Sequence, residues 1–154
     1  MSEGSAGNRD IARLNAFTDG IFVVSMTLLV LDIRLPELPA KIEDRELLHA
    51  LSELWPKYFG YVVSFLVIAE FWLGYTSKFG RMRSADSGFA RLNVLFLLVV
   101  GFVPFVTTLL TGHAGSVATS LYAATMMVLS LQLISMWLYA TRKGLLAPDP
   151  AGPT

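Results

Sequence analysis

The stretch from Arg13 to Pro36, RLNAFTDGIFVVSMTLLVLDIRLP, is apolar enough to cross a membrane, yet it carries an aspartate near each end. A hydrocarbon core about 30 Å thick is crossed by roughly 20 helical residues. At about 1.5 Å per residue, residues 13–34 would extend about 31 Å, with charged side chains at both interfaces. This segment raises the question of why a membrane helix keeps Asp19.

The whole chain has the composition of a membrane protein. Of its 154 residues, 54% are hydrophobic and 16% are charged, against about 25% charged residues in an ordinary soluble domain. The formal net charge is zero, which gives no general attraction to nucleic acid. There is no cysteine, and there are only two histidines, so disulfides and thiolate chemistry are excluded and a metal site is disfavoured. No nucleophile–base pair is visible either, so we expect neither an enzyme nor a bound cofactor.

Four segments are long and apolar enough to span a bilayer as helices, namely residues 13–34, 57–77, 91–112 and 117–141. We therefore predict an all-α, polytopic membrane helical bundle within residues 9–143, multi-pass in the cell membrane and surrounded by lipid. A short amphipathic helix is predicted over residues 43–54, where leucines recur at helical spacing. Residues 1–8 and 147–154, rich in Gly and Ser or in Pro, are expected to be disordered.

Lysine and arginine are distributed unevenly between the two sides that this topology defines. Eight of the 12 lie on the side of the termini and of the loop between the second and third spans, and four lie on the other side. Because cytoplasmic loops carry the excess of basic residues, we expect both termini to be cytoplasmic.

Asp19 is costly where it stands, because an ionisable group in the hydrocarbon core costs a few kcal/mol unless a partner or water receives it. It lies six residues after Arg13, about 9 Å below the interface, and on a different face of the helix. Asp19 therefore needs a hydrogen-bond donor from another helix. Residues at similar depth that can donate are Trp72, Tyr75 and Asn93.

Glu70 raises the same question, since it lies eight residues before Lys78 and therefore at nearly the depth of Asp19. Two interpretations are open. In one, Glu70 is neutral, faces the bundle and bonds a hydroxyl such as that of Ser64 or Tyr75. In the other, the two carboxyls approach each other and one is protonated, as in a proton-coupled cation carrier.

The middle of the first helix carries a stripe of apolar residues. Val24, Leu28 and Leu31 recur at i, i+4 and i+7, with Thr27 beside them and Ser25 on a different side. Such a stripe can face lipid, the interior of the bundle or a pore, and periodicity alone does not choose among these.

Residues 13–36 resemble the first helix of the transmembrane protein 175 family, the endolysosomal and bacterial potassium channels. The hallmark of that family is Arg, three residues, then Phe-Ser-Asp-Gly. With threonine in place of serine, it stands here as Arg13, Phe17, Thr18, Asp19 and Gly20. The segments YVVSFLVIAEFW, RLNVLFLLVVGFVPFVTTLL and LYAATMMVLSLQLISMWLYA are similar to the family's second, third and fourth helices. Family subunits usually have six such helices, so this chain would be a shortened, four-helix relative.

The resemblance implies a potassium-selective leak channel whose first helices surround the pore. Bacterial members of the family are tetramers, so a homotetramer is expected. Val24 would form the innermost constriction, Leu28 and Leu31 would form further apolar rings, and Thr27 would place a hydroxyl near the ion path and influence selectivity. An apolar ring gates by excluding water, and a nearby hydroxyl lowers the cost of a partly dehydrated cation.

The resemblance also implies that Arg13, Phe17, Thr18 and Asp19 form a network with the second helix that holds the pore helix in place. The family tends to carry a histidine after the tryptophan of the second helix, whereas this chain has Tyr75 in that region. Tyrosine donates a hydrogen bond but carries no positive charge near neutral pH. A proton response that depends on histidine is therefore expected to be weakened.

Three functions remain open at this point. The first is a channel for which potassium is the permeant ion, in the plasma membrane of a prokaryote. The second is a non-conducting assembly subunit or degenerate relative, and the third is the proton-coupled cation carrier. No inverted repeat or interrupted helix pair supports a carrier, so we expect the channel.

Overall fold

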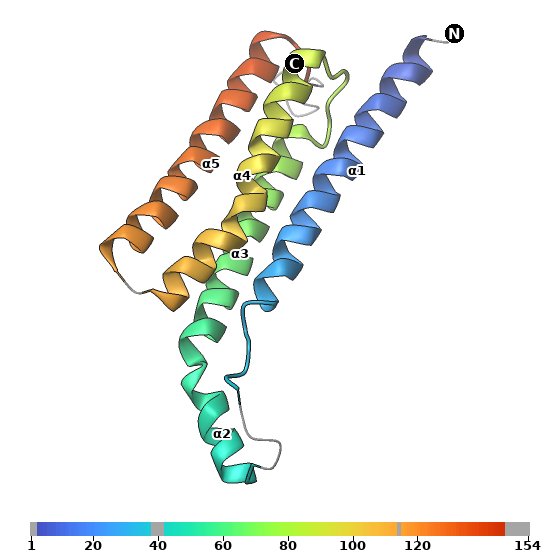
Figure 1. The fold of residues 1–154 in the computed structure, drawn as a ribbon. Coiled ribbons are helices and arrows are strands. Elements are labelled where there is room, and N and C mark those ends of the chain that lie inside the picture. Colours follow the sequence, from blue (N-terminus) through green and yellow to red (C-terminus); the bar gives the residue numbers. More distant parts are fainter. Residues whose placement is uncertain (1–2, 38–41, 114, 147–154) are drawn as a thin grey trace, which may run out of the picture.

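The computed structural model describes residues 3–37, 42–113 and 115–146. In this part of the chain five α-helices follow one another: α1 (Glu3–Val30), α2 (Asp44–Glu53), α3 (Trp55–Phe79), α4 (Ser87–Gly112) and α5 (Ser116–Arg142). The four long helices form a bundle in which consecutive members alternate in direction (Figure 1). All four are long and apolar enough to cross a membrane, which confirms the predicted all-α membrane bundle.

The ends of α1 differ from the prediction. The helix begins at Glu3, whereas the sequence predicts a start at Arg13 and a disordered segment over residues 1–8. It ends at Val30 because the last turn tightens, with the Leu31 amide donating to the Leu28 carbonyl at 3.1 Å. The predicted disorder of residues 147–154 lies outside the described residues.

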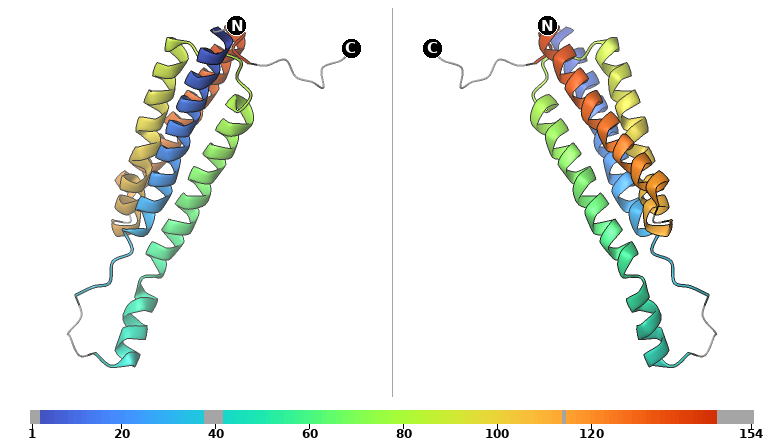
Figure 2. Two further views of the ribbon diagram at one scale, coloured as in Figure 1. Left: turned by 90° about the vertical axis from the view of Figure 1, so that its right-hand side faces the viewer. Right: turned by 90° about the vertical axis from the view of Figure 1, so that its left-hand side faces the viewer.

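The amphipathic segment forms α2, which is separated from α3 by Leu54 alone. Pro56 lies in the first turn of α3, where its missing N–H breaks no helical hydrogen bond. Figure 2 shows α2 running on beyond the ends of the other helices, nearly in line with α3. The short helix therefore projects from the bundle instead of covering it.

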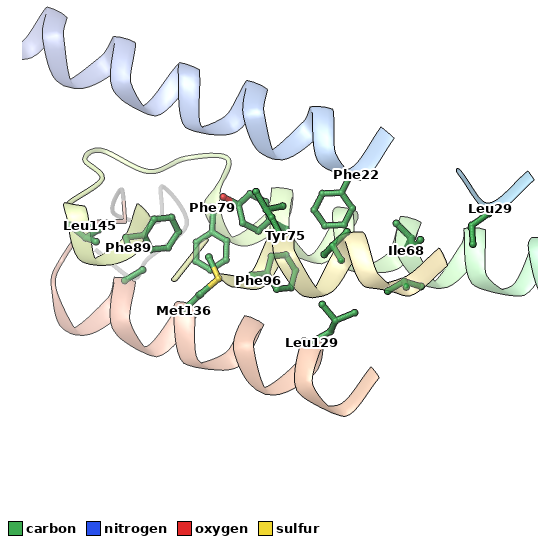
Figure 3. Packing of buried hydrophobic residues seen from close by; sticks show 14 residues of the cluster. Phe22, Leu29, Ile68, Tyr75, Phe79, Phe89, Phe96, Leu129, Met136 and Leu145 are labelled. Carbon is green, nitrogen blue, oxygen red and sulfur yellow. The ribbon is translucent and has the colours of Figure 1, made fainter. Parts of the chain in front are cut away.

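α4 is the central helix, since it packs against α1, α3 and α5. Its buried aromatic residues meet those of α1 and α3 in one cluster (Figure 3). Tyr75 and Phe96 are stacked with ring centroids 5.9 Å apart, and Phe22 lies 6.0 Å from Phe96. Lipid tails are as apolar as these side chains, so close packing and polar bonds, not a hydrophobic driving force, hold the helices together.

Two glycines allow helices to approach closely. A Cβ at Gly60 would collide with the Thr111 side chain of α4, and a Cβ at Gly88 would collide with the Tyr139 hydroxyl of α5.

After α5 the chain turns back, and the Arg83 amide donates to the Leu145 carbonyl at 2.9 Å. The start of α1, the end of α5 and the connection from α3 to α4 all lie at one end of the bundle (Figure 1).

Candidate functional site

α1 buries one face against the bundle and exposes the opposite face. The buried residues are Ile11, Thr18, Phe22, Ser25 and Leu29. At about 100° per residue, the residues on the opposite side share a sector about 100° wide. We call this sector, from Arg13 onward, the outer face of α1 and include Leu31 in the turn directly after the helix. All of these residues are exposed: Arg13, Phe17, Gly20, Val24, Thr27, Leu28 and Leu31.

The predicted gate residues all lie on the outer face. The side chains of Val24, Leu28 and Leu31 are 51%, 43% and 60% exposed. The Thr27 hydroxyl donates to the Val24 carbonyl at 2.9 Å, so its proton is used within the helix and its oxygen lone pairs are free to accept. Ser25, by contrast, is buried and donates to the Ile21 carbonyl at 2.8 Å.

Thr18 and Asp19 are consecutive in the sequence but bind different helices. The buried Thr18 hydroxyl accepts a hydrogen bond from the Asn93 amide of α4 at 2.8 Å. Asp19 Oδ1 accepts one from Trp72 Nε1 of α3 at 2.9 Å. Because neighbouring side chains of a helix diverge by about 100°, the two bonds together fix the rotation of α1. We call this pair of bonds the α1 clamp.

The three donors predicted for Asp19 have separate positions. Trp72 binds Asp19, whereas Asn93 binds the neighbouring Thr18. Tyr75 is buried beside Thr18, and among the described residues its hydroxyl has no partner with hydrogen-bond geometry. The donor types were visible in the sequence, but the order of the helices decides which carboxyl or hydroxyl each one reaches.

Two members of the predicted network, Arg13 and Phe17, lie outside the α1 clamp. Arg13 is exposed on the outer face, and within the part of the chain that the structure describes it forms no ion pair. Phe17 is also exposed, and it lines an apolar groove between α1 and α4 together with Ile21 and Leu98. Among the described residues of one subunit, Arg13 therefore forms no ion pair with α3, and Phe17 lies beside residues of α4.

Glu70 points away from the bundle. The buried stripe of α3 contains Ser64, Ile68, Tyr75 and Phe79, and Glu70 is exposed on the opposite side of the helix. The interpretation that Glu70 faces the bundle and bonds Ser64 or Tyr75 is wrong. Trp72, which holds Asp19, is turned by about 200° from Glu70, so the two carboxyls do not share a site within the subunit.

Further contacts anchor both ends of the bundle. Near the end of α1, Asp32 Oδ2 accepts from the Thr111 hydroxyl at 3.0 Å. At the opposite end, Asp86 caps α4 by accepting from the Phe89 amide at 2.7 Å, and it also accepts from the Tyr139 hydroxyl at 2.7 Å. These two bonds lower the pKa of the Asp86 carboxyl below its ordinary value.

Neither anchor was predicted from the sequence. An aspartate directly before a helix is a common N-cap, so the cap at Asp86 could have been found from the sequence. Its bond to Tyr139 depends on tertiary structure. Among the described residues, no group of three or more His, Cys, Asp or Glu side chains is placed to hold a metal ion.

Comparison with known proteins identifies the family. The family model described as the endosomal/lysosomal potassium channel TMEM175 matches residues 13–104. The chain belongs to the TMEM175 family. It is therefore a multi-pass membrane protein, and the resemblance of its first helix to that family is confirmed.

The similarity extends over most of this chain and part of each relative. A protein named as a potassium channel from Streptomyces collinus is 37% identical over 137 residues, which are 86% of this chain and 65% of the relative. One from Chamaesiphon minutus is 34% identical over 85% of this chain and 66% of its own length. The human endosomal/lysosomal proton channel TMEM175 is 35% identical over 60% of this chain and 19% of its own length. The chain thus spans slightly less than two thirds of the two bacterial relatives.

A solved structure has the same fold. The crystal structure of a lysosomal potassium-selective channel TMEM175 homolog from Chamaesiphon minutus superposes with a TM-score of 0.77 and 31% identity. The superposition covers 89% of this chain and 76% of that one.

Proposed function

We propose that the chain is the pore-lining subunit of a potassium-selective, leak-type channel, a homo-oligomer and most simply a homotetramer. It would lie in the plasma membrane of a prokaryote with both termini in the cytoplasm. The observation that carries this proposal is the outer face of α1, which is exposed along its length and held in one orientation by the α1 clamp.

The outer face combines apolar and polar groups. Gly20 and the Thr27 hydroxyl lie on it among the apolar residues, and Arg13 lies at its interfacial end. Copies of the chain arranged around an axis would turn this face toward a common channel. That its bacterial relatives are named as potassium channels supports the choice of ion.

Each residue of the stripe has a distinct role in the proposal. Val24 forms the narrowest ring, and Leu28 and Leu31 form wider rings that control wetting of the pore. The Thr27 hydroxyl, whose proton is bonded to the Val24 carbonyl, turns its oxygen lone pairs toward a partly dehydrated potassium ion.

The carrier alternative receives less support from the geometry. A proton relay between Asp19 and Glu70 requires the two carboxyls to approach each other. Asp19 is bound to Trp72, and Glu70 is exposed on the far side of α3.

The test is ion flux through the purified, mass-defined oligomer in liposomes. Val24→Asn should raise cation flux several-fold and lower the preference for potassium over sodium, because a polar ring no longer excludes water. Val128, a 40% exposed valine of α5, provides the matched control, and Val128→Asn should leave flux unchanged. Unchanged flux and ion preference in Val24→Asn would refute the pore assignment.

A further inference from the structure

A crevice opens between α3 and α5 in the half of the bundle that contains the connection from α4 to α5. Its volume is about 290 Å³, and α4 forms its floor. The walls are apolar, with Phe59 and Val63 from α3 and Leu110 from α4. Four hydroxyl residues also line it, Ser64, Thr107, Thr111 and Tyr122. We call this space the hydroxyl crevice.

Three of these hydroxyls, those of Thr107, Ser64 and Tyr122, are linked in a row. Thr107 Oγ1 lies 2.8 Å from Ser64 Oγ, which lies 3.3 Å from the Tyr122 hydroxyl. Ser64 and Thr107 are 2% and 3% exposed, so the inner end of the row is closed by protein. A hydroxyl can donate once and accept twice. Tyr122 makes one hydrogen bond among the described residues, so its hydroxyl can serve a ligand as well.

We propose that the hydroxyl crevice binds a small neutral amphiphile with a single hydrogen-bonding head, such as an alkanol or a phenol. The head bonds the Tyr122 hydroxyl, and the apolar body lies against Phe59, Val63 and Leu110. None of the residues lining the crevice is charged, so a charged ligand would lose its hydration without compensation.

The size and the polarity of the crevice restrict the ligand further. A cavity of about 150 Å³ holds benzene, and this crevice is about 290 Å³, so it holds one ring with a short alkyl chain or one medium alkanol. A plain hydrocarbon chain fits the walls but leaves the remaining hydrogen-bonding capacity of Tyr122 in an apolar environment. The head is therefore expected to determine binding.

The crevice also touches an anchor of α1. Thr111 lines it and donates to Asp32 at 3.0 Å, so a bound ligand lies beside the contact that holds the far end of α1. The site itself does not depend on conduction, so the binding experiment tests it separately from the proposed pore.

The experiment is photolabelling of the purified chain in lipid nanodiscs with a diazirine-bearing octanol, followed by peptide mass spectrometry. We expect saturable labelling of the α3 and α5 residues around the crevice. Excess octanol should displace the label, whereas excess octane should not. Labelling that does not saturate, or that octane displaces equally well, would show that the probe only lies against an apolar, lipid-facing surface. That result would overturn the proposal.

Paired variants test the position of the ligand. Val63→Trp fills the crevice and should abolish specific labelling, whereas Val62→Trp changes an exposed neighbour that does not line it and should preserve labelling. Tyr122→Phe keeps the shape and should weaken octanol binding several-fold. Equal labelling of the two tryptophan variants, with elution and helical content unchanged, would contradict the proposal.

Discussion

α1 and α5 both expose a long apolar face and both bond two other helices, but α1 does so through consecutive residues, one of which is charged. On α5, Tyr122 bonds Ser64 of α3 and Tyr139 bonds Asp86 at the start of α4. On α5 the exposed Ser130 and Ser135 hydroxyls bond carbonyls of their own helix, and residues 116–141 contain no Asp, Glu, Lys, Arg or His. On α1, Asp19 and Thr18 bind α3 and α4. Exposure therefore does not distinguish the two helices, whereas the ionisable residue that α1 keeps within its span does.

The largest expected effect comes from removing the buried half of the α1 clamp. Thr18→Val leaves the buried Asn93 amide without its acceptor, which costs about 1–3 kcal/mol. The matched change on α5 is Thr125→Val, because that buried hydroxyl bonds only its own helix among the described residues, at the Leu121 carbonyl. Thermal unfolding followed by circular dichroism should show a clear fall in melting temperature for Thr18→Val and a small fall for Thr125→Val. Equal losses would remove the distinction between the two helices.

The exposed half of the α1 clamp should affect assembly more than ion preference. Asp19→Ala removes the acceptor for Trp72, which frees α1 to rotate, so fewer native oligomers should form. Native mass spectrometry measures the oligomer distribution, and Glu70→Gln serves as the control because Glu70 lies outside the clamp. An Asp19→Ala protein that keeps the native distribution would argue against this role.

A smaller effect is expected where α5 meets α4. Gly88→Ala places a Cβ against the Tyr139 hydroxyl and should break its bond to Asp86, which should lower the stability of the folded chain. Gly101→Ala is the control, since a Cβ there meets no atom within 4 Å. The melting temperature should fall for Gly88→Ala and stay level or rise for Gly101→Ala. A fall of the same size in both would show that close approach at Gly88 does not explain the loss.

The smallest effect concerns pH at the same contact. The pKa of Asp86 is lowered from 3.8 in the folded chain, so its stabilising contribution is complete above that value and is lost as the pH falls through the folded pKa. Wild type should therefore exceed Asp86→Asn in melting temperature at neutral pH, and the difference should shrink in acid. A difference in melting temperature that stays constant with pH would show that the ionised Asp86 carboxyl is not the source of this stabilisation.

The sequence was sufficient to predict the number and the approximate positions of the helices, because the signals for a helix are local. Apolar length predicts four spans, and leucine spacing predicts the short helix before Pro56. The start of α1 at Glu3 was missed because residues 1–8, rich in Gly and Ser, carry no apolar periodicity. The early end of α1 at Val30 depends on a tightened turn that hydropathy does not register.

The sequence defined the site only in part. It indicates how deep each residue of a helix lies in the membrane, but not which helices pack side by side or which faces they turn toward one another. Depth alone made Asn93 a plausible donor for Asp19, yet Asn93 faces Thr18, one residue away and about 100° around the helix. Glu70 matched Asp19 in depth but faces outward. The row of hydroxyls from Thr107 to Tyr122 joins three helices, and nothing local in the sequence indicates it.

The most direct test of the difference between α1 and α5 is the access of water to one position on each. The chain has no cysteine, and Thr27 and Ser130 are both exposed hydroxyl residues bonded to their own helix at 2.9 Å. Thr27→Cys and Ser130→Cys are therefore matched reporters for a charged, membrane-impermeant thiol reagent applied to the oligomer in nanodiscs, with potassium flux measured in liposomes. We expect modification of Thr27→Cys with a fall in flux, and no modification of Ser130→Cys. Protection of Thr27→Cys, or its modification without any change in flux, would contradict a pore lined by α1.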